Sequence, residues 1–124
     1  MKNREVVEKW VECFNRADID GLCELYHQDA INHQVVTEPS NGLEEIRKLF
    51  EIEFGRAKMV CQVEKIHDAG DWIILEWSDP AGLRGCGIFH IIDSRIAYQR
   101  GYFDQLSFFR SQGLGIPDEY LNLR

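Results

Sequence analysis

Residues 43–78 read LEEIRKLFEIEFGRAKMVCQVEKIHDAGDWIILEWS, and the spacing of the apolar residues changes at Gly55. Before Gly55 the apolar residues recur every three or four positions, which predicts one face of a helix. That face consists of Leu43, Ile46, Leu49, Phe50 and Phe54. After Gly55 the apolar residues alternate with polar ones, as in a strand with one buried face. The stretch therefore predicts a helix followed by a sheet.

Two further helices are predicted toward the N-terminus. The first has an apolar face with helical spacing, made of Val6, Val7, Trp10, Val11 and Phe14. It should end near Ala17, because Asp18 and Asp20 favour a turn and offer N-caps to a short second helix over residues 22–26. Residues 30–36 mix β-branched and polar side chains, which predicts a short strand.

The helix within residues 43–54 has recognisable boundary signals. Residues 38–42 contain Pro and Gly and predict a loop before it. Asn41, with Glu44 three residues later, resembles a capping box at the start of the helix. Gly55 is the expected C-cap.

The C-terminal half predicts a meander of strands. Alternating runs cover residues 59–67, 72–78, 83–93 and 95–104. Short connections between these runs favour antiparallel hairpins, and residues 106–110 predict a last helical turn before a tail over residues 113–117. Three helices followed by such strands predict an α+β fold. In it the helices pack on one face of a strongly curved, mainly antiparallel sheet and form a cone with a pocket. We expect residues 1–124 to form one domain.

Composition excludes several classes of protein. Hydrophobic residues make up 44% of the 124 residues, which is far from the composition of disordered chains. The formal net charge of −7 and the absence of a Lys/Arg cluster argue against nucleic acid as a partner. No apolar run is long enough for a membrane span or a secretion signal, so we expect a cytoplasmic protein.

Metal and cofactor sites are not expected either. The cysteines form no C-x-x-C pair, and the histidines show no ligand spacing on a common helix. These residues are Cys13, Cys23, Cys61, Cys86, His27, His33, His67 and His90. We therefore predict a protein that works without a metal or another cofactor.

Residues 10–30, WVECFNRADIDGLCELYHQDA, followed by Gly42 and Ile46, resemble the opening of the nuclear transport factor 2-like superfamily, in particular its SnoaL-like polyketide cyclase branch. Residues 87–89, 95–96 and 102–106 agree with the C-terminal half of that family. The resemblance implies a cone with a ligand pocket, usually in a homodimer packed through the outer face of the sheet. It also implies a choice among cyclases, isomerases, epoxide hydrolases, dehydratases and non-catalytic proteins.

Asp104 and His33 are the catalytic candidates. Asp104 matches the position of the acidic residue that SnoaL-like cyclases use as general acid/base, and an apolar cavity would raise the pKa of its carboxyl group. The alternative is that Asp104 caps the last helical turn or pairs with Arg100. His33 lies where the superfamily places a polar group near the cavity, and its imidazole could relay a proton. The alternative is a hydrogen-bonded surface histidine.

The ligand-binding candidates come from the strands. Alternation puts Trp72, Ile74 and Glu76 on one face and Ile73, Leu75 and Trp77 on the other, with the inward face undecided. The last strand places Tyr102 and Arg100 on the same face as Asp104 if no bulge intervenes. With Glu76, His90 and Trp77 they form the predicted ligand-binding set, and Arg and Tyr side chains suit a ligand that develops negative charge.

The leading hypothesis is a small-molecule-binding, cofactor-free enzyme that uses acid/base chemistry on a small hydrophobic or polyketide-like carbonyl compound. The alternative is a non-catalytic ligand-binding or dimeric scaffold module. The two differ in what they expect of the pocket, since the first needs a proton-transferring group beside the ligand.

Overall fold

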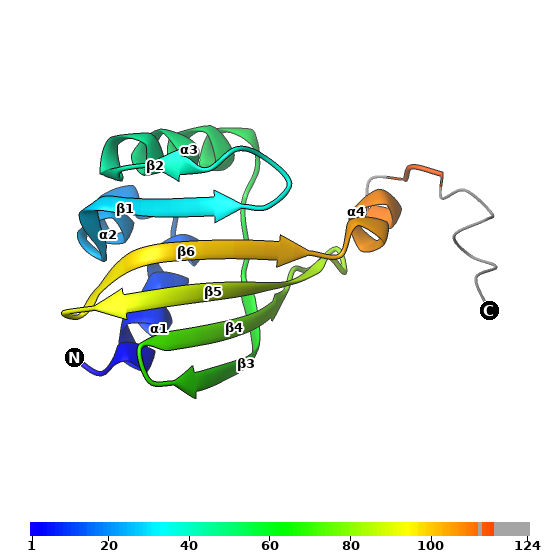
Figure 1. The fold of residues 1–124 in the computed structure, drawn as a ribbon. Coiled ribbons are helices and arrows are strands. Elements are labelled where there is room, and N and C mark those ends of the chain that lie inside the picture. Colours follow the sequence, from blue (N-terminus) through cyan, green and yellow to red (C-terminus); the bar gives the residue numbers. More distant parts are fainter. Residues whose placement is uncertain (112, 116–124) are drawn as a thin grey trace.

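In the computed structural model, which describes residues 1–111 and 113–115, three helices pack on one face of a six-stranded sheet (Figure 1). The elements are α1 (Asn3–Asn15), α2 (Ile19–Glu24), β1 (Tyr26–Gln34), β2 (Ser40–Asn41), α3 (Leu43–Arg56), β3 (Gln62–Ala69), β4 (Trp72–Ser78), β5 (Arg84–Ile92), β6 (Arg95–Phe103) and α4 (Gln105–Ser111). The predicted α+β class is confirmed.

The strand order in the sheet is β2-β1-β6-β5-β4-β3. Strands β3 to β6 pair in sequence as antiparallel hairpins, as predicted. Strand β1 pairs with β6 in parallel, with His33 opposite Arg100. This pairing was not predicted, because it joins segments far apart in the chain and no turn signal encodes it.

The sheet has an inner face, which packs against α1, α2 and α3, and an outer face, which is turned toward the viewer in Figure 1. Along β4, Ile73 and Leu75 are buried on the inner face, whereas Trp72 and Glu76 are exposed on the outer face. The predicted division of this strand into two faces is confirmed.

The core lies between the helices and the inner face. Its buried members include Val6, Val7, Trp10, Ile46, Phe50, Ile73, Leu75, Phe89 and Ile96. The sequence pattern marks these positions as apolar in the helices and in the strands. The apolar faces of the helices pack against the apolar face of the sheet, and their burial stabilises the fold.

Several predicted boundaries are wrong for local reasons. The Asp18 side chain accepts a hydrogen bond from the backbone N–H of Gly21 at 2.9 Å, so α2 starts at Ile19, earlier than predicted. It also ends earlier, because Tyr26 is already the first residue of β1. Gly42 precedes α3 with φ at 85°, and the predicted capping box does not form.

The C-terminal boundary of α3 and the chain beyond β6 also differ in detail from the prediction. Gly55 lies inside α3, which continues to Arg56, so it is not a C-cap. The predicted last helical turn is confirmed as α4, which projects away from the sheet in Figure 1. The end of the predicted tail, residues 116–117, lies outside the described residues. Within the described residues, no helix has the length and apolarity needed to cross a bilayer.

Candidate functional site

A buried chain of hydrogen bonds crosses the inside of the cone. The indole Nε1–H of Trp10 in α1 donates to the hydroxyl oxygen of Tyr26 at 2.9 Å, and that hydroxyl donates to Oε1 of Gln99. Burial raises the pKa of the Tyr26 phenol far above its ordinary value, so the hydroxyl keeps its proton. The chain joins α1, β1 and β6 and fixes the orientation of three polar groups in an apolar interior.

A second pair of polar side chains follows on the same face of the sheet. Asn32 is 2% exposed, and its side-chain oxygen accepts a hydrogen bond of 2.7 Å from Nε2 of Gln34. The Gln34 amide occupies the space that a side chain at Gly101 would take on the neighbouring strand. Asn32 pairs with Gln99 across β1 and β6, so the two buried amides lie in one row.

Glu53 adds a carboxyl group to this interior. It lies seven residues after Ile46 and three after Phe50, both of which are buried, so it falls on the inward stripe of α3. Desolvation raises the pKa of the half-buried Glu53 carboxyl, and Arg56 only partly opposes this rise. The charge of Glu53 in turn contributes to the raised pKa of Tyr26, which places the carboxyl within electrostatic reach of the phenol.

No hydrogen-bond acceptor or donor contacts the Glu53 side chain within residues 1–111 and 113–115. An unpartnered, half-buried carboxyl with a raised pKa can hold or release a proton closer to neutral pH than an exposed one. Sequence reasoning missed Glu53, although a glutamate in the apolar stripe of a helix is a readable signal. Tyr26, Asn32 and Gln99 were also missed.

Aromatic side chains fill the space around these polar groups. Trp10 stacks on Phe14 with ring centroids 4.9 Å apart, and Phe50 stacks on Phe54 at 5.8 Å. Trp77, predicted as a ligand-binding residue, does lie on the inner face, where its indole covers Gly85.

Asp104 lies in a different environment from the one predicted. It is exposed beyond the end of β6, where its Oδ1 accepts from the backbone N–H of Leu106 at 3.0 Å and its Oδ2 from the hydroxyl of Ser107 at 2.6 Å. The bond from Ser107 lowers the pKa of the Asp104 carboxyl, whereas we expected an apolar cavity to raise it. That expectation is wrong, and the alternative of a cap on the last helix describes the observed contacts.

His33, Arg100 and Tyr102 lie on the outer face. His33 pairs with Arg100, while their neighbours Asn32 and Gln99 point inward, so the expectation that this set lines the interior is wrong. The His33 ring contacts the carbonyl oxygen of Thr37 at 3.2 Å, the hydrogen-bonded arrangement that we had kept as its alternative. Asp104 lies four residues beyond the partner of His33, which is roughly 13 Å along a strand. No shared ligand position follows from this geometry.

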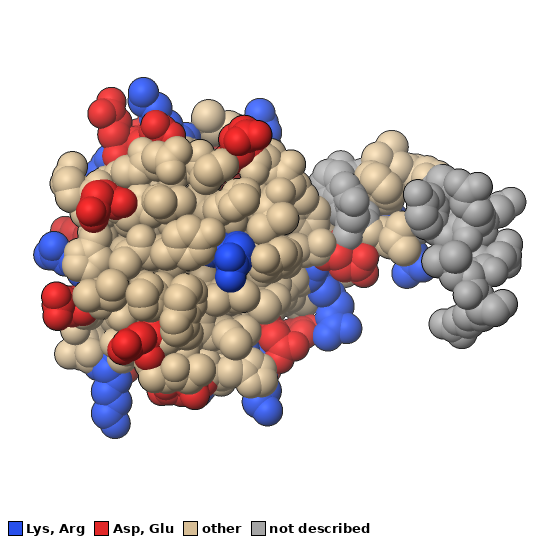
Figure 2. Space-filling view, viewed as in Figure 1, with Lys and Arg blue, Asp and Glu red and all other residues tan. Residues whose placement is uncertain are grey.

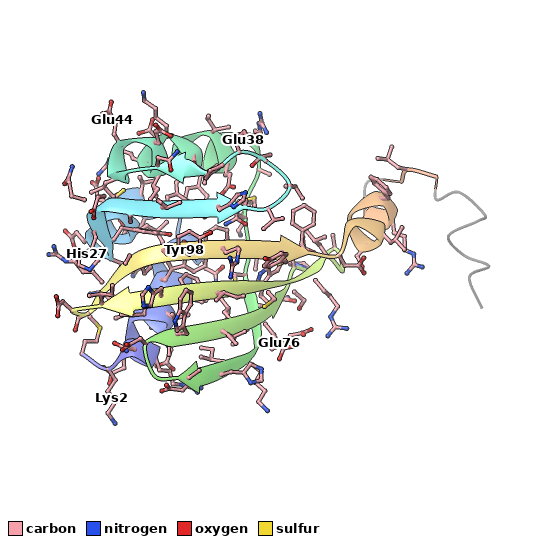
Figure 3. The ribbon with its side chains drawn as sticks, in the orientation of Figure 1. Lys2, His27, Glu38, Glu44, Glu76 and Tyr98 are labelled. Atoms are coloured by element: carbon pink, nitrogen blue, oxygen red, sulfur yellow. The ribbon has the colours of Figure 1, made fainter. Side chains whose placement is uncertain are left out.

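Glu76 and His90 also belong to the outer face, which settles the undecided direction of Glu76. Figure 3 labels Glu76 on β4, and its Oε2 lies 2.6 Å from Nε2 of His67. The hydrogen bond from His67 lowers the pKa of Glu76. The His90 ring stacks on Trp72 with centroids 4.2 Å apart.

Two hollows lie outside the core. One, of about 500 Å³, lies beside α2 and α3 and is lined by Asp20, Cys23, Glu24, Tyr26, Gln28, Leu43, Arg47 and Arg95. The other, of about 360 Å³, lies at the α4 end of the sheet and is lined by Glu64, Glu76, Arg84, Gly85, Cys86, Tyr102, Phe103 and Asp104. The second hollow brings together three of the predicted site residues, Glu76, Tyr102 and Asp104.

The cysteines at positions 13, 23, 61 and 86 are free thiols. Among the described residues, no three His, Cys, Asp or Glu side chains lie in a group that could hold a metal ion.

Solved structures place this geometry in a known class. A protein with a ketosteroid isomerase-like fold from Catenulispora acidiphila, crystallised with trimethylamine, superposes with a TM-score of 0.78 at 16% identity over 90% of this chain and 94% of that one. An epoxide hydrolase of the LEH-like type from Mycobacterium tuberculosis gives 0.76 at 22% identity over 86% of each chain. A nuclear transport factor 2-like protein of unknown function from Cytophaga hutchinsonii superposes with a TM-score of 0.75 at 16% identity. The match covers 88% of this chain and 96% of that one.

These identities show the fold, which is the nuclear transport factor 2-like cone, and nothing of the chemistry. Residues 7–99 match the model of the SnoaL-like domain, and the chain belongs to that family. The resemblance predicted from the sequence is thereby confirmed. No curated protein matches the sequence.

Proposed function

We propose that this SnoaL-like protein binds a small, mostly apolar molecule at the α4 end of the cone, between α3 and the inner face of β1 and β6, and that Glu53 exchanges a proton with it. The half-buried, unpartnered Glu53 carboxyl carries the proposal. A carboxyl group with a raised pKa holds its proton to a higher pH than an exposed one, which suits it to general acid/base catalysis.

The interior polar groups support this assignment. Asn32 and Gln99 are buried amides, and Phe50, which stacks on Phe54, packs against Tyr26, the partner of Gln99. A few polar groups in an aromatic setting are typical of small-molecule sites. The hydrogen bonds of the Gln99 side chain to Tyr26, and of Tyr26 to Trp10, keep this wall rigid. A small hydrophobic or polyketide-like carbonyl compound would meet amide donors at its oxygen and a carboxyl group at an acidic carbon.

The catalytic roles predicted for Asp104 and His33 stay predictions, and one assay separates them from the role of Glu53. Lactones, epoxides and enolisable ketones are tested as substrates with wild type and with Glu53→Gln, Asp104→Asn and Glu51→Gln. Glu51 is exposed on the same helix and serves as the matched control. We expect Glu53→Gln to lower kcat for any active substrate at least 100-fold, the range of general acid/base catalysis, and the other two to retain activity. Activity that survives Glu53→Gln and is lost in Asp104→Asn would overturn the assignment.

Ligand retention tests binding independently of turnover. Protein purified from its own host is analysed by native mass spectrometry, and a bound small molecule that is released on unfolding is expected. A non-catalytic scaffold is the second candidate, and the aromatic stacks that fill the interior favour it. Protein that carries no molecule and turns over none of the panel would support the scaffold.

We also propose that the protein forms a homodimer through the outer face. This face is mostly uncharged in Figure 2, and it exposes apolar side chains that include Trp72, at 38%, and Ile92, at 44%. Apolar surface of this kind is typical of contact surfaces between proteins. A monomer at all concentrations in sedimentation velocity would contradict this proposal.

A further inference from the structure

Arg100 is an anomaly on the outer face. Its Nε is buried from solvent and has no hydrogen-bond partner among the described residues. A shielded N–H of a guanidinium group costs free energy unless an acceptor reaches it, so such a group requires an explanation. No ion pair involving Arg100 forms within residues 1–111 and 113–115.

Two tyrosines hold the Arg100 guanidinium in place. Its Cζ lies 5.6 Å from the ring centroid of Tyr98 and 6.0 Å from that of Tyr102, both within the range of cation–π contact. The side chain is thus already positioned on the outer face of β6, which lies between β1 and β5 inside the sheet. Figure 2 shows that this face is mostly uncharged. An arginine fixed in this way suits a carboxylate that arrives from outside the chain, because its planar fork matches two carboxylate oxygens.

Glu76 supplies a carboxylate on the same face of the same sheet. Arg100 lies opposite Ile88, which lies opposite Ile74, and Glu76 is two residues further along β4. Arg100 and Glu76 are therefore two strands apart across the sheet and two residues apart along the strand direction. Their backbones are separated by roughly 12 Å. Glu76 uses Oε2 to contact His67, and among the described residues no hydrogen bond forms at its Oε1.

A two-fold axis that runs parallel to the sheet, above β5 and at right angles to the line from Arg100 to Glu76, turns a second copy face to face with the first and places each of these residues over the other. Cys86 and Ile88 flank that axis on the outer face and would form the apolar centre of the contact. Packed sheets lie about 10 Å apart, a gap that an arginine and a glutamate side chain can bridge. In such an isologous contact every pair forms twice.

We propose that Arg100 of one copy pairs with Glu76 of the other across the outer face, and that this reciprocal pair sets the register of the homodimer. The inference rests on the homodimer proposed above and adds its partner residues. It also gives the Arg100 guanidinium group a carboxylate partner, and it places a positive and a negative group opposite each other in an otherwise uncharged contact.

Charge exchange tests the pair. Wild type, Arg100→Glu, Glu76→Arg and the double exchange are compared by sedimentation velocity over a dilution series, with thermal unfolding to show that each variant is folded. We expect each single exchange to raise the Kd of the dimer at least tenfold, because it brings two like charges together, and the double exchange to restore dimerisation. Lys58→Glu, an exposed change outside the sheet, is the matched control and should dimerise like wild type.

The outcomes separate the two proposals. Folded single exchanges that dimerise like wild type would overturn the pair. Monomeric single exchanges that the double exchange fails to restore would also overturn it, while leaving the outer face as the interface. Wild type that stays monomeric throughout would instead overturn the homodimer itself. If Arg100→Glu does not fold, Arg100→Gln and Glu76→Arg carry the same test, since each removes or reverses one member of the pair.

Discussion

Replacing Tyr26 with phenylalanine removes one oxygen atom from the middle of the buried hydrogen-bond chain. The ring can stay in place against Phe50, because the two side chains differ only in the hydroxyl group. The Trp10 indole N–H would lose its acceptor, and Oε1 of Gln99 would lose its donor. Both groups remain buried, so water does not replace the lost partner without a rearrangement.

The expected cost follows from these two orphaned groups. A buried polar group without a partner costs about 1–3 kcal/mol, so with two such groups the free energy of unfolding should fall by at least about 2 kcal/mol. For a domain of this length each kcal/mol lowers the melting temperature by roughly 4 °C, which gives a decrease of about 10 °C. The loss is a large fraction of the stability of an ordinary domain.

Urea unfolding followed by circular dichroism measures this change, with Tyr98→Phe as the matched control. Tyr98 is half-buried on the outer face, and no hydrogen bond of its hydroxyl occurs among the described residues, so its loss should change the free energy by no more than about 0.5 kcal/mol. Adding Gln99→Leu to Tyr26→Phe should cost less than the sum of the single changes, because it removes an orphaned group. A Tyr26→Phe variant as stable as Tyr98→Phe would refute the role given to the chain.

Three further predictions concern single side chains. Because the folded-state pKa of Glu53 is raised, its ionised form destabilises the fold; Glu53→Gln should therefore increase stability at neutral pH, with a gain that disappears below the ordinary pKa of glutamate, as urea titrations across pH would show. Asp104→Ala should release the two capping bonds and speed amide exchange in α4 without moving the main unfolding midpoint. Gly85→Ala should lose about 1–3 kcal/mol by thermal unfolding, since its Cβ would lie 2.5 Å from a backbone oxygen of β6, whereas Gly55→Ala should gain stability.

The helices and hairpins could be predicted because their signals are local. The apolar stripe of α1 and the short connections between β3, β4, β5 and β6 are encoded within a few residues of each element. The parallel pairing of β1 with β6 could not be predicted in this way, because it depends on contacts between residues about 70 positions apart, such as Tyr26 and Gln99. Without that pairing, the sequence does not show that Asn32 and Gln99 lie side by side.

The sequence did not show which face of β6 points toward the helices. Alternation correctly puts Tyr98, Arg100 and Tyr102 on one face, but alternation alone does not say which face the helices cover. Gln99 faces them because its amide is bonded to Tyr26, and no pattern within β6 records that bond. Arg100 and Tyr102 were therefore predicted to line the pocket, whereas Gln99 on the opposite face of β6 is the residue that points toward the helices.

The same alternation gives β6 two separable tasks. Gln99 belongs to the buried chain that shapes the interior, and Arg100, the next residue, lies between two tyrosines on the opposite face. A strand thickness separates their side chains, so the interior site and the outer contact share a backbone but no polar partner. Glu53 reaches the interior from α3 and not from the sheet, which is why a search along the strands for paired carboxylates leads to Asp104 and Glu76 on the outside. The proton-carrying group that we propose therefore lies on α3, the helix that covers the sheet, and not on a strand.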